Sequence, residues 1–290
     1  MSSQIYSNGN FSESATIPAY DHGVLFGAGF FETFRTRNGV PVRLAAHLTR
    51  LHAACDRIGI RIPETHLAAS SASERWAPAL AALLEAHGLT DGVFRLTLTA
   101  GPNPAPLGAG IYEAPQEILT CRALPPEAPA EGITLHRLDT VRDTGEWSPR
   151  PKSLNYLNTL LAARELAPHR RHPADEGLIC DARGFMSEGV FSNLFWVKTG
   201  VVFTPHESTG CLPGIGRAHL LTKLRASGVR VEESESSPTA LLHADAIAMV
   251  SCVRGVVPVA RVVDSDGVPY WEPGDDSAGE LERLITVFAK

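Results

Sequence analysis

Lys152 is the side chain in this sequence whose type and setting best suit covalent chemistry. It lies in the stretch SPRPKSLNYL (148–157), directly after a proline and before a helix-like run, and it is one of only four lysines in the chain. A lysine forms a Schiff base when its amine is neutral and held still, and Pro151 fixes the backbone next to it. Taken alone, Lys152 is also typical of a surface lysine at a helix start. An arginine could not replace it in a Schiff base, because a guanidinium stays protonated. The other lysines have less rigid settings in a turn, inside a helix and at the C-terminus: Lys198, Lys223 and Lys290.

Two further groups suit a cofactor of the pyridoxal phosphate type, which needs an acid on its ring nitrogen and a cradle for its phosphate. Glu188, at a bend between strand-like segments, is the candidate acid. Gly214 and Gly216 precede a helix, where backbone N–H groups and the helix dipole favour an anion. Arg50, on an earlier helix, could add a charge-assisted phosphate contact. Each feature alone is equally typical of a loop carboxylate, a plain turn or a solvated arginine, so the prediction depends on their combination with Lys152.

The elements that must position these residues mix strands and helices without a regular βαβ alternation. This pattern favours two α+β domains over a doubly wound sheet. A hairpin is expected over 30–44 with its turn at Asn38-Gly39, and Ser153 is expected to cap the helix that follows it. The Pro-rich segment 125–132 is the best candidate linker. Other expected helices cover 44–58, 74–87, 216–227 and 277–288, and other expected strands cover 92–101, 117–124, 133–141, 246–263 and several pieces of 176–205.

Composition excludes several classes of function. The chain of 290 residues is 44% hydrophobic and has a formal net charge of −6, without a block of basic residues, which argues against a nucleic-acid partner. The N-terminal stretch lacks the features of a signal peptide, and no apolar run is long enough to span a membrane. The five cysteines are scattered without a CxxC pair, which indicates thiols in a reducing compartment and no metal site. We therefore expect a cytoplasmic protein.

In their order and spacing these motifs resemble the fold-type IV (class IV) pyridoxal phosphate enzymes. This family includes branched-chain aminotransferases, D-amino-acid transaminases and 4-amino-4-deoxychorismate lyases. The resemblance covers nearly the whole chain, through DHGVLFGAGFFETFR, HLTRL, KSLNYL, SEGVFSNLF, LPGIGR and SCVRGVVPV. It implies an α+β fold with a small α/β domain (1–120), a linker (121–131) and a larger β-barrel-like α/β domain (132–290) that binds the cofactor. It also implies a homodimer.

The resemblance also implies roles for individual residues. Lys152 would form the Schiff base and move the substrate proton, and Glu188 would pair with the ring nitrogen. The phosphate would be bound by Arg50, by the backbone of Ile215 and Gly216, and by Ser251 or Cys252. Tyr156 and Asn193 would lie close to the ring, and Phe31, Thr33 and Arg35 would face the substrate.

Three departures from the family pattern bear on the subfamily. Gly216 replaces a threonine whose hydroxyl usually contacts the phosphate, and His22 replaces an arginine. Val190 and Phe191 stand where small hydroxylated residues are commoner, which predicts a more apolar pocket.

The motif KSLNYL, with Tyr156 four residues after Lys152, is more similar to that of the lyases than to that of the branched-chain enzymes. We therefore expect a 4-amino-4-deoxychorismate lyase, which forms 4-aminobenzoate and pyruvate in the folate branch. The alternatives are a class IV aminotransferase acting on D-amino acids or branched-chain amino acids, and a non-catalytic binding protein on this fold. The lyase substrate has two carboxylates, for which the candidate partners are Arg35 first, then Arg95 and Arg254.

Overall fold

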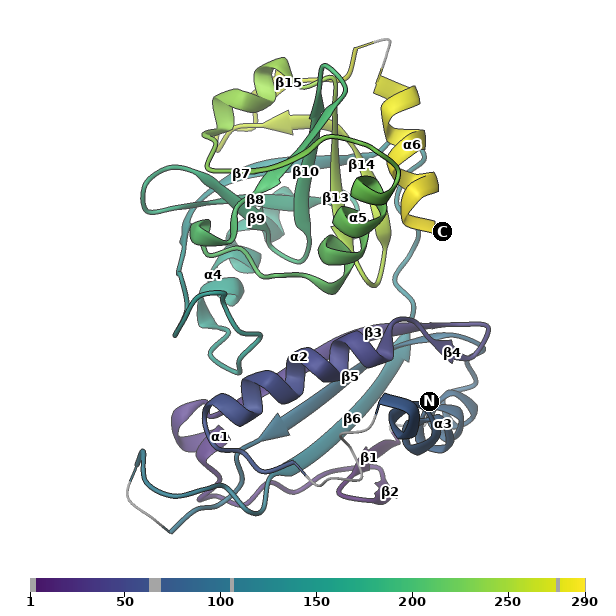
Figure 1. Ribbon diagram of the computed structural model, residues 1–290, viewed down its shortest axis with the longest axis vertical. Coiled ribbons are helices and arrows are strands. Elements are labelled where there is room, and N and C mark those ends of the chain that lie inside the picture. The colour runs from purple at the N-terminus through teal and green to yellow at the C-terminus, as the bar shows by residue number, and fades with distance from the viewer. Residues whose placement is uncertain (1–3, 63–68, 105–106, 275–276, 290) are drawn as a thin grey trace. The chain divides into compact units, whose positions relative to one another are not determined.

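The structure, a computed structural model, describes residues 4–62, 69–104, 107–274 and 277–289. The chain forms two compact units, one of Met1–Leu124 with Lys152–Asn155 and one of Pro125–Pro151 with Tyr156–Lys290 (Figure 1). The division expected from sequence assigned residues 152–155 to the second domain. They group with the first unit because the N–H of Phe31 donates to the carbonyl of Lys152 at 3.0 Å, and the N–H of Leu154 donates to the carbonyl of Gly29 at 2.9 Å.

The first unit is built on an antiparallel sheet with the strand order β2-β1-β6-β5-β3-β4. The expected hairpin is confirmed, since β3 and β4 are joined through Asn38 (φ 52°) and Gly39 (φ 73°), both in the left-handed region. The strands are β1 (Ile5–Ser7), β2 (Asn10–Ser12), β3 (Gly29–Arg37), β4 (Val40–Pro41), β5 (Gly92–Thr99) and β6 (Gln116–Ala123).

One face of this sheet is apolar and packs against helices. The rings of Phe34 and Phe94 stack at 5.8 Å, and Leu96 and Leu119 are fully buried beside them. Helix α2 (Leu44–Arg57) lies along this sheet (Figure 1) and buries leucines at helical spacing, as its sequence predicts. The unit also contains α1 (His22–Phe26) and α3 (Ala69–Ala86).

The second unit is a mixed nine-stranded sheet with the order β12-β11-β10-β13-β14-β7-β8-β9, to which β15 adds beside β14. The edge strand β9 is followed at once by the interior strand β10, so the sheet curls. The strands are β7 (Ile133–Arg142), β8 (Glu176–Asp181), β9 (Met186–Gly189), β10 (Asn193–Lys198), β11 (Val201–Pro205), β12 (Val231–Ser234), β13 (Ala246–Ser251), β14 (Gly255–Val263) and β15 (Pro269–Trp271).

Strand β13 is buried on both faces, as its continuous apolar sequence predicts. Ile247 and Met249 join a core cluster with Leu135 and Trp196. Ala248, on the opposite face, joins a second cluster. The helices of this unit are α4 (Leu157–Leu166), α5 (Ile215–Ala226) and α6 (Ser277–Ala289), with the short 3-10 helices η2 (Ala167–His169), η3 (Glu207–Thr209) and η4 (Pro238–His243).

The expected cap at Ser153 was wrong. Helix α4 begins four residues later, with Tyr156 at its N-cap position and no side-chain cap. Ser153 forms a bridge to Phe30 of β3 instead, because the residues after Pro151 continue in extended conformation along that strand.

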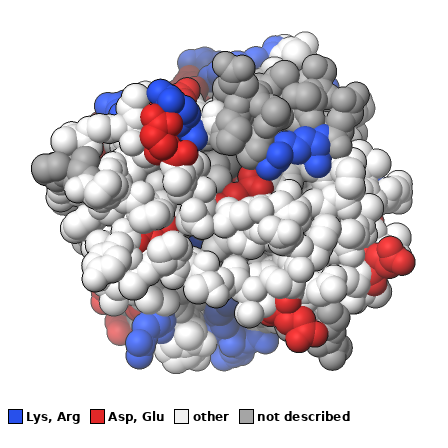
Figure 2. All heavy atoms as spheres, turned by 90° about the horizontal axis from the view of Figure 1, so that it is seen from below, with Lys and Arg blue, Asp and Glu red and all other residues white. Residues whose placement is uncertain are grey.

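Charged side chains are interspersed with uncharged ones on the face drawn in Figure 2. Within the described ranges, no helix has both the length and the hydropathy that crossing a membrane requires. All five cysteines are thiols outside disulfides.

Candidate active site

The expected site residues fall into two groups, one in each unit. The first unit contains Phe31, Thr33, Arg35, Arg50 and Lys152. The second contains Tyr156, Glu188, Asn193, Ile215, Gly216, Ser251 and Cys252. Each group is described within its own unit.

Lys152 shares an aromatic ring with an arginine. Its Nζ lies 4.6 Å from the ring centroid of Phe31, and the guanidinium carbon of Arg95 lies 3.5 Å from the same centroid. Both contacts have the geometry of cation–π interactions. The ring of Phe31 is buried. The backbone N–H of Phe31 donates to the carbonyl of Lys152, so the lysine backbone is fixed to β3.

Thr33, Arg35 and Arg95 lie on the same face of the sheet as Phe31. Thr33 is the cross-strand partner of Arg95, and side chains of directly opposed residues point to the same side. Arg254, the third candidate for a substrate carboxylate, lies in the second unit and donates to the carbonyl of Pro126 at 2.6 Å.

Arg50 forms a bidentate ion pair with Glu32. Its Nε donates to Oε1 and its Nη2 to Oε2 of Glu32, each at 2.7 Å, and His47 Nδ1 lies 2.6 Å from Oε2. Burial raises the pKa of Glu32, but the charge of Arg50 and hydrogen bonds from His47 and Arg50 outweigh it and lower the pKa to about 2. Burial lowers the pKa of His47. The sequence predicted Arg50 as a phosphate contact but did not predict either of these partners.

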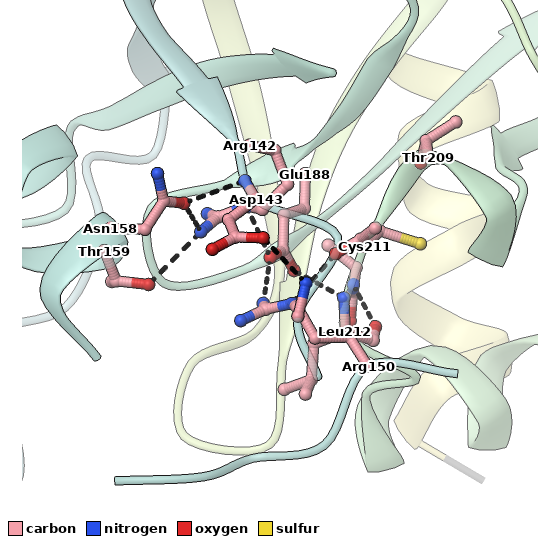
Figure 3. Close-up of polar contacts among 12 residues, drawn as sticks. Arg142, Asp143, Arg150, Asn158, Thr159, Glu188, Thr209, Cys211 and Leu212 are labelled. Atoms are coloured by element: carbon pink, nitrogen blue, oxygen red, sulfur yellow. Dashed lines mark hydrogen bonds and ion pairs between the residues drawn. The ribbon is translucent and has the colours of Figure 1, made fainter. Parts of the chain in front are cut away.

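Glu188 is a buried carboxylate held by donors from three segments (Figure 3). Its Oε1 accepts from Arg150 Nη2 and lies 3.3 Å from Arg142 Nε, and its Oε2 accepts from the N–H of Leu212 at 3.0 Å. Arg142 also donates from Nη1 to Asn158 Oδ1 at 2.7 Å. These donors fix the orientation of the Glu188 carboxylate, which is what an acid partner for a ring nitrogen requires.

The two arginines were missed from sequence. Burial lowers the pKa of Arg142, although Glu188 opposes this, whereas for Arg150 the attraction of Glu188 outweighs burial and raises the pKa. The placement of Arg150 between two prolines, two residues before Lys152, was a usable signal. Arg142 lies within a strand, and nothing in its sequence surroundings indicates an ion pair.

The N-terminus of α5 fits an anion cradle made of backbone. Gly214 is its N-cap and offers no side chain, and a Cβ atom there would lie 2.0 Å from Oδ1 of Asn193. Asn193 Nδ2 donates to the carbonyl of Leu212 at 2.9 Å, so this asparagine shapes the loop before the helix. The first N–H groups of an α-helix have no intrahelical acceptor, and those of Ile215 and Gly216 are therefore suited to bind a phosphate.

The structure explains why position 216 is glycine. A Cβ atom on Gly216 would lie 3.1 Å from the carbonyl carbon of Ser251 and 3.2 Å from the nitrogen of Cys252. The backbone of 251–252 therefore packs directly against the helix start, where a threonine side chain would be crowded. The hydroxyl of Ser251 accepts the N–H of Arg254 at 3.1 Å and fixes the turn after β13.

The other departures have structural roles of their own. His22 is buried, and its Nδ1 lies 3.0 Å from the hydroxyl of Tyr112, which holds the 110–112 segment on α1. Val190 packs in a core cluster with Leu138, whereas Phe191 is 54% exposed. Val190 therefore fills the core of the second unit.

Comparison with known proteins gives matches along most of the chain. The model of the Amino-transferase class IV family matches residues 29–262. The aminodeoxychorismate lyase of Bacillus subtilis is 30% identical over 284 residues, which cover 97% of this chain and 92% of the relative. A protein of Methanocaldococcus jannaschii named as a putative branched-chain-amino-acid aminotransferase is 30% identical over 264 residues, covering 89% and 88%.

A solved structure gives the same result. The 4-amino-4-deoxychorismate lyase of Pseudomonas aeruginosa is 28% identical and superimposes with a TM-score of 0.77, covering 97% of each chain. The similarity therefore extends over both units and over all of the predicted site residues.

Proposed function

Because the chain belongs to the aminotransferase class IV family of pyridoxal-phosphate-dependent enzymes, we propose that it is a 4-amino-4-deoxychorismate lyase. Membership confirms four predictions from sequence: the family, the two-domain α+β fold, pyridoxal 5′-phosphate as cofactor, and an enzyme in place of a non-catalytic binding protein. The proposed reaction converts 4-amino-4-deoxychorismate into 4-aminobenzoate and pyruvate.

The observation that carries the lyase proposal is the polar sheet face beside Lys152. A cation, Arg95, lies on the same ring as the reactive amine, and Thr33 and Arg35 extend this polar face along β3. A branched-chain amino acid would need an apolar surface for its side chain. A substrate with two carboxylates would instead find guanidinium groups there, which bind carboxylates through charge-assisted hydrogen bonds.

Each site residue has a proposed task toward the cofactor. Bound pyridoxal phosphate supplies a Schiff-base carbon and an electron sink that acidifies the C–H beside the substrate amine. Lys152 would attach the cofactor and would serve as the base that takes this proton, and Glu188 would hold the proton at the ring nitrogen. The phosphate would be bound by Arg50, by the N–H groups of Ile215 and Gly216, and by Ser251 or Cys252. Tyr156 and Asn193 are proposed to border the ring.

The protein is further proposed to act as a homodimer in the cytoplasm. Helix α4 exposes three leucines at i, i+3 and i+4 spacing, namely Leu157 (66%), Leu160 (54%) and Leu161 (52%). An exposed apolar stripe of this kind is typical of a surface covered by another chain, and we propose a second copy as the cover.

A class IV aminotransferase is the second candidate. It is favoured by whole-length relatives of that name, including the Methanocaldococcus protein. Both reactions begin with the same proton removal at the amine-bearing carbon, so Lys152 and Glu188 serve either one equally.

The test is to supply 4-amino-4-deoxychorismate without any keto acid and to measure pyruvate and 4-aminobenzoate. The lyase predicts equal amounts of both products from the wild-type enzyme. It predicts neither from Lys152→Ala and an unchanged yield from Lys223→Ala, a matched control on α5. Failure to form pyruvate, together with amino transfer from D-alanine or a branched-chain amino acid to a keto acid, would establish the aminotransferase instead.

A further inference from the structure

Glu32 is an ionised side chain on the helix-covered face of a sheet. It lies between Phe30 and Phe34 along β3, and only 1% of its side chain is exposed. Burying a carboxylate costs free energy unless hydrogen-bond donors surround it. Helix α2 supplies these donors from His47 and Arg50, which lie three residues apart and therefore on one face of the helix.

We propose that Glu32 and His47 are positioning residues that hold Arg50 ready for the phosphate group of the cofactor. This inference rests on the proposed function of Arg50 as a phosphate ligand. The carboxylate of Glu32 engages the Nε and Nη2 atoms of Arg50, both at 2.7 Å. Two parallel bonds along one edge of a planar guanidinium fix its plane and its direction.

His47 completes the clamp from the other side of the carboxylate. Its Nδ1 donates to Oε2 of Glu32 at 2.6 Å. Burial lowers the pKa of His47, and the charges that act on it come from Glu32 on β3, Arg50 on α2 and Lys152. The contact with the carboxylate places a proton on Nδ1, and Nε2 is buried without a hydrogen-bond partner in the described part of the chain.

The clamp gives Arg50 a fixed conformation before any ligand binds. An arginine side chain loses rotamer entropy when it is immobilised. Here this entropy is lost when the chain folds, so phosphate binding does not have to immobilise the guanidinium. The side chain of Arg50 is 17% exposed and that of Glu32 is 1% exposed, so part of the arginine side chain reaches the surface whereas the carboxylate is buried.

The experiment compares two ligands that form the same bond to Lys152, namely pyridoxal phosphate and pyridoxal. Their dissociation constants are measured by visible absorbance with the cofactor-free protein. The ratio of the dissociation constant of pyridoxal to that of pyridoxal phosphate isolates the contribution of the phosphate. In Glu32→Gln and in Arg50→Met this ratio is expected to fall by about tenfold, the equivalent of one charge-assisted hydrogen bond, and in His47→Phe by a few-fold.

The double variant Glu32→Gln/Arg50→Met decides whether Glu32 acts through Arg50. The proposal predicts that its ratio equals that of Arg50→Met alone, since residues that act as a unit are not additive. Glu117→Gln is the matched control, because Glu117 is a buried carboxylate of the same sheet that pairs with Arg75 at 3.2 Å. Its ratio is expected to match that of the wild type.

Other results would overturn the proposal. Equal losses of affinity for both ligands in Glu32→Gln would make the cluster merely structural, and a further fall in the double variant would separate Glu32 from Arg50. Glu32→Asp keeps the negative charge but shortens the side chain by one methylene. It therefore repeats the comparison without placing a neutral residue at position 32. A wild-type protein that binds neither ligand refutes the proposed function itself, which is a different result from an unchanged ratio.

Discussion

Glu176 offers a test of how burial controls charge next to the site. It lies on β8, is 4% exposed, and contacts the turn between β9 and β10. Its Oε1 accepts from the hydroxyl of Ser192 at 2.6 Å and its Oε2 from the N–H of Phe191 at 3.2 Å. Burial raises the pKa of Glu176 to about 7, because these hydrogen bonds and the charge of Arg170 only partly offset it.

The raised pKa has a defined consequence for stability. Between the ordinary pKa of 4.5 and about 7, the folded chain binds the Glu176 proton and the unfolded chain does not. The free energy of unfolding therefore falls as pH rises through this window and is level above it. At about 1.4 kcal/mol for each unit of pKa shift, the loss is roughly 3 kcal/mol.

Replacing Glu176 with glutamine removes this loss. The amide oxygen can accept the N–H of Phe191, and the amide nitrogen can donate to Ser192, whose hydroxyl rotates to accept. The variant is neutral at every pH. Its stability relative to the wild type is therefore expected to rise between pH 5 and pH 8 by up to roughly 3 kcal/mol.

Urea unfolding at pH 5 and pH 8 measures this difference, with Glu165→Gln as a control whose effect on stability stays the same between these two pH values. Burial raises the pKa of Glu165, but hydrogen bonds from Thr140 and Asp139 outweigh it and lower the pKa. Its stabilisation is present above the ordinary pKa of 4.5 and is lost as pH falls below it, so Glu165→Gln should be less stable than the wild type at pH 5 and at pH 8 alike. A stability difference between Glu176→Gln and the wild type that is the same at both pH values would refute the reasoning.

Three further predictions follow from the same structure. Gly216→Thr should destabilise the protein by about 1–3 kcal/mol in thermal unfolding, through overpacking against the 251–252 backbone. It should also weaken pyridoxal phosphate binding measured by visible absorbance. A stable variant with unchanged affinity would contradict the crowding. Arg142→Met should lower the free energy of unfolding measured in urea, but by less than the ~3–5 kcal/mol that loss of a sole partner costs, because Arg150 still pairs with Glu188. A larger loss would mean that Arg142 is the main partner. Leu160→Glu should give monomers by light scattering, whereas Leu242→Glu, at a residue 46% exposed on η4, should not; monomeric wild-type protein would exclude the proposed dimer.

Local sequence determined the elements and the type of chemistry. The turn at Asn38-Gly39 needs residues that accept positive φ, and the leucine spacing of 44–57 needs only a helical period, so both were predictable without tertiary contacts. The proline before Lys152 and the glycines at 214 and 216 carry the same kind of local information. Together with Glu188 they indicated a cofactor of the pyridoxal phosphate type, and the resemblance to the class IV family implied the enzyme.

Tertiary structure alone decided which groups pair. Glu188 is separated by 38 and 46 residues from the two arginines on its carboxylate, and Glu32 is 18 residues from Arg50, so no local pattern records these bonds. The same holds for Ser153, which the local pattern assigns to a helix cap but which hydrogen bonding along β3 keeps extended. A carboxylate buried by folding must find its donors wherever the chain brings them, and that requirement sets the partners and the charge of this site.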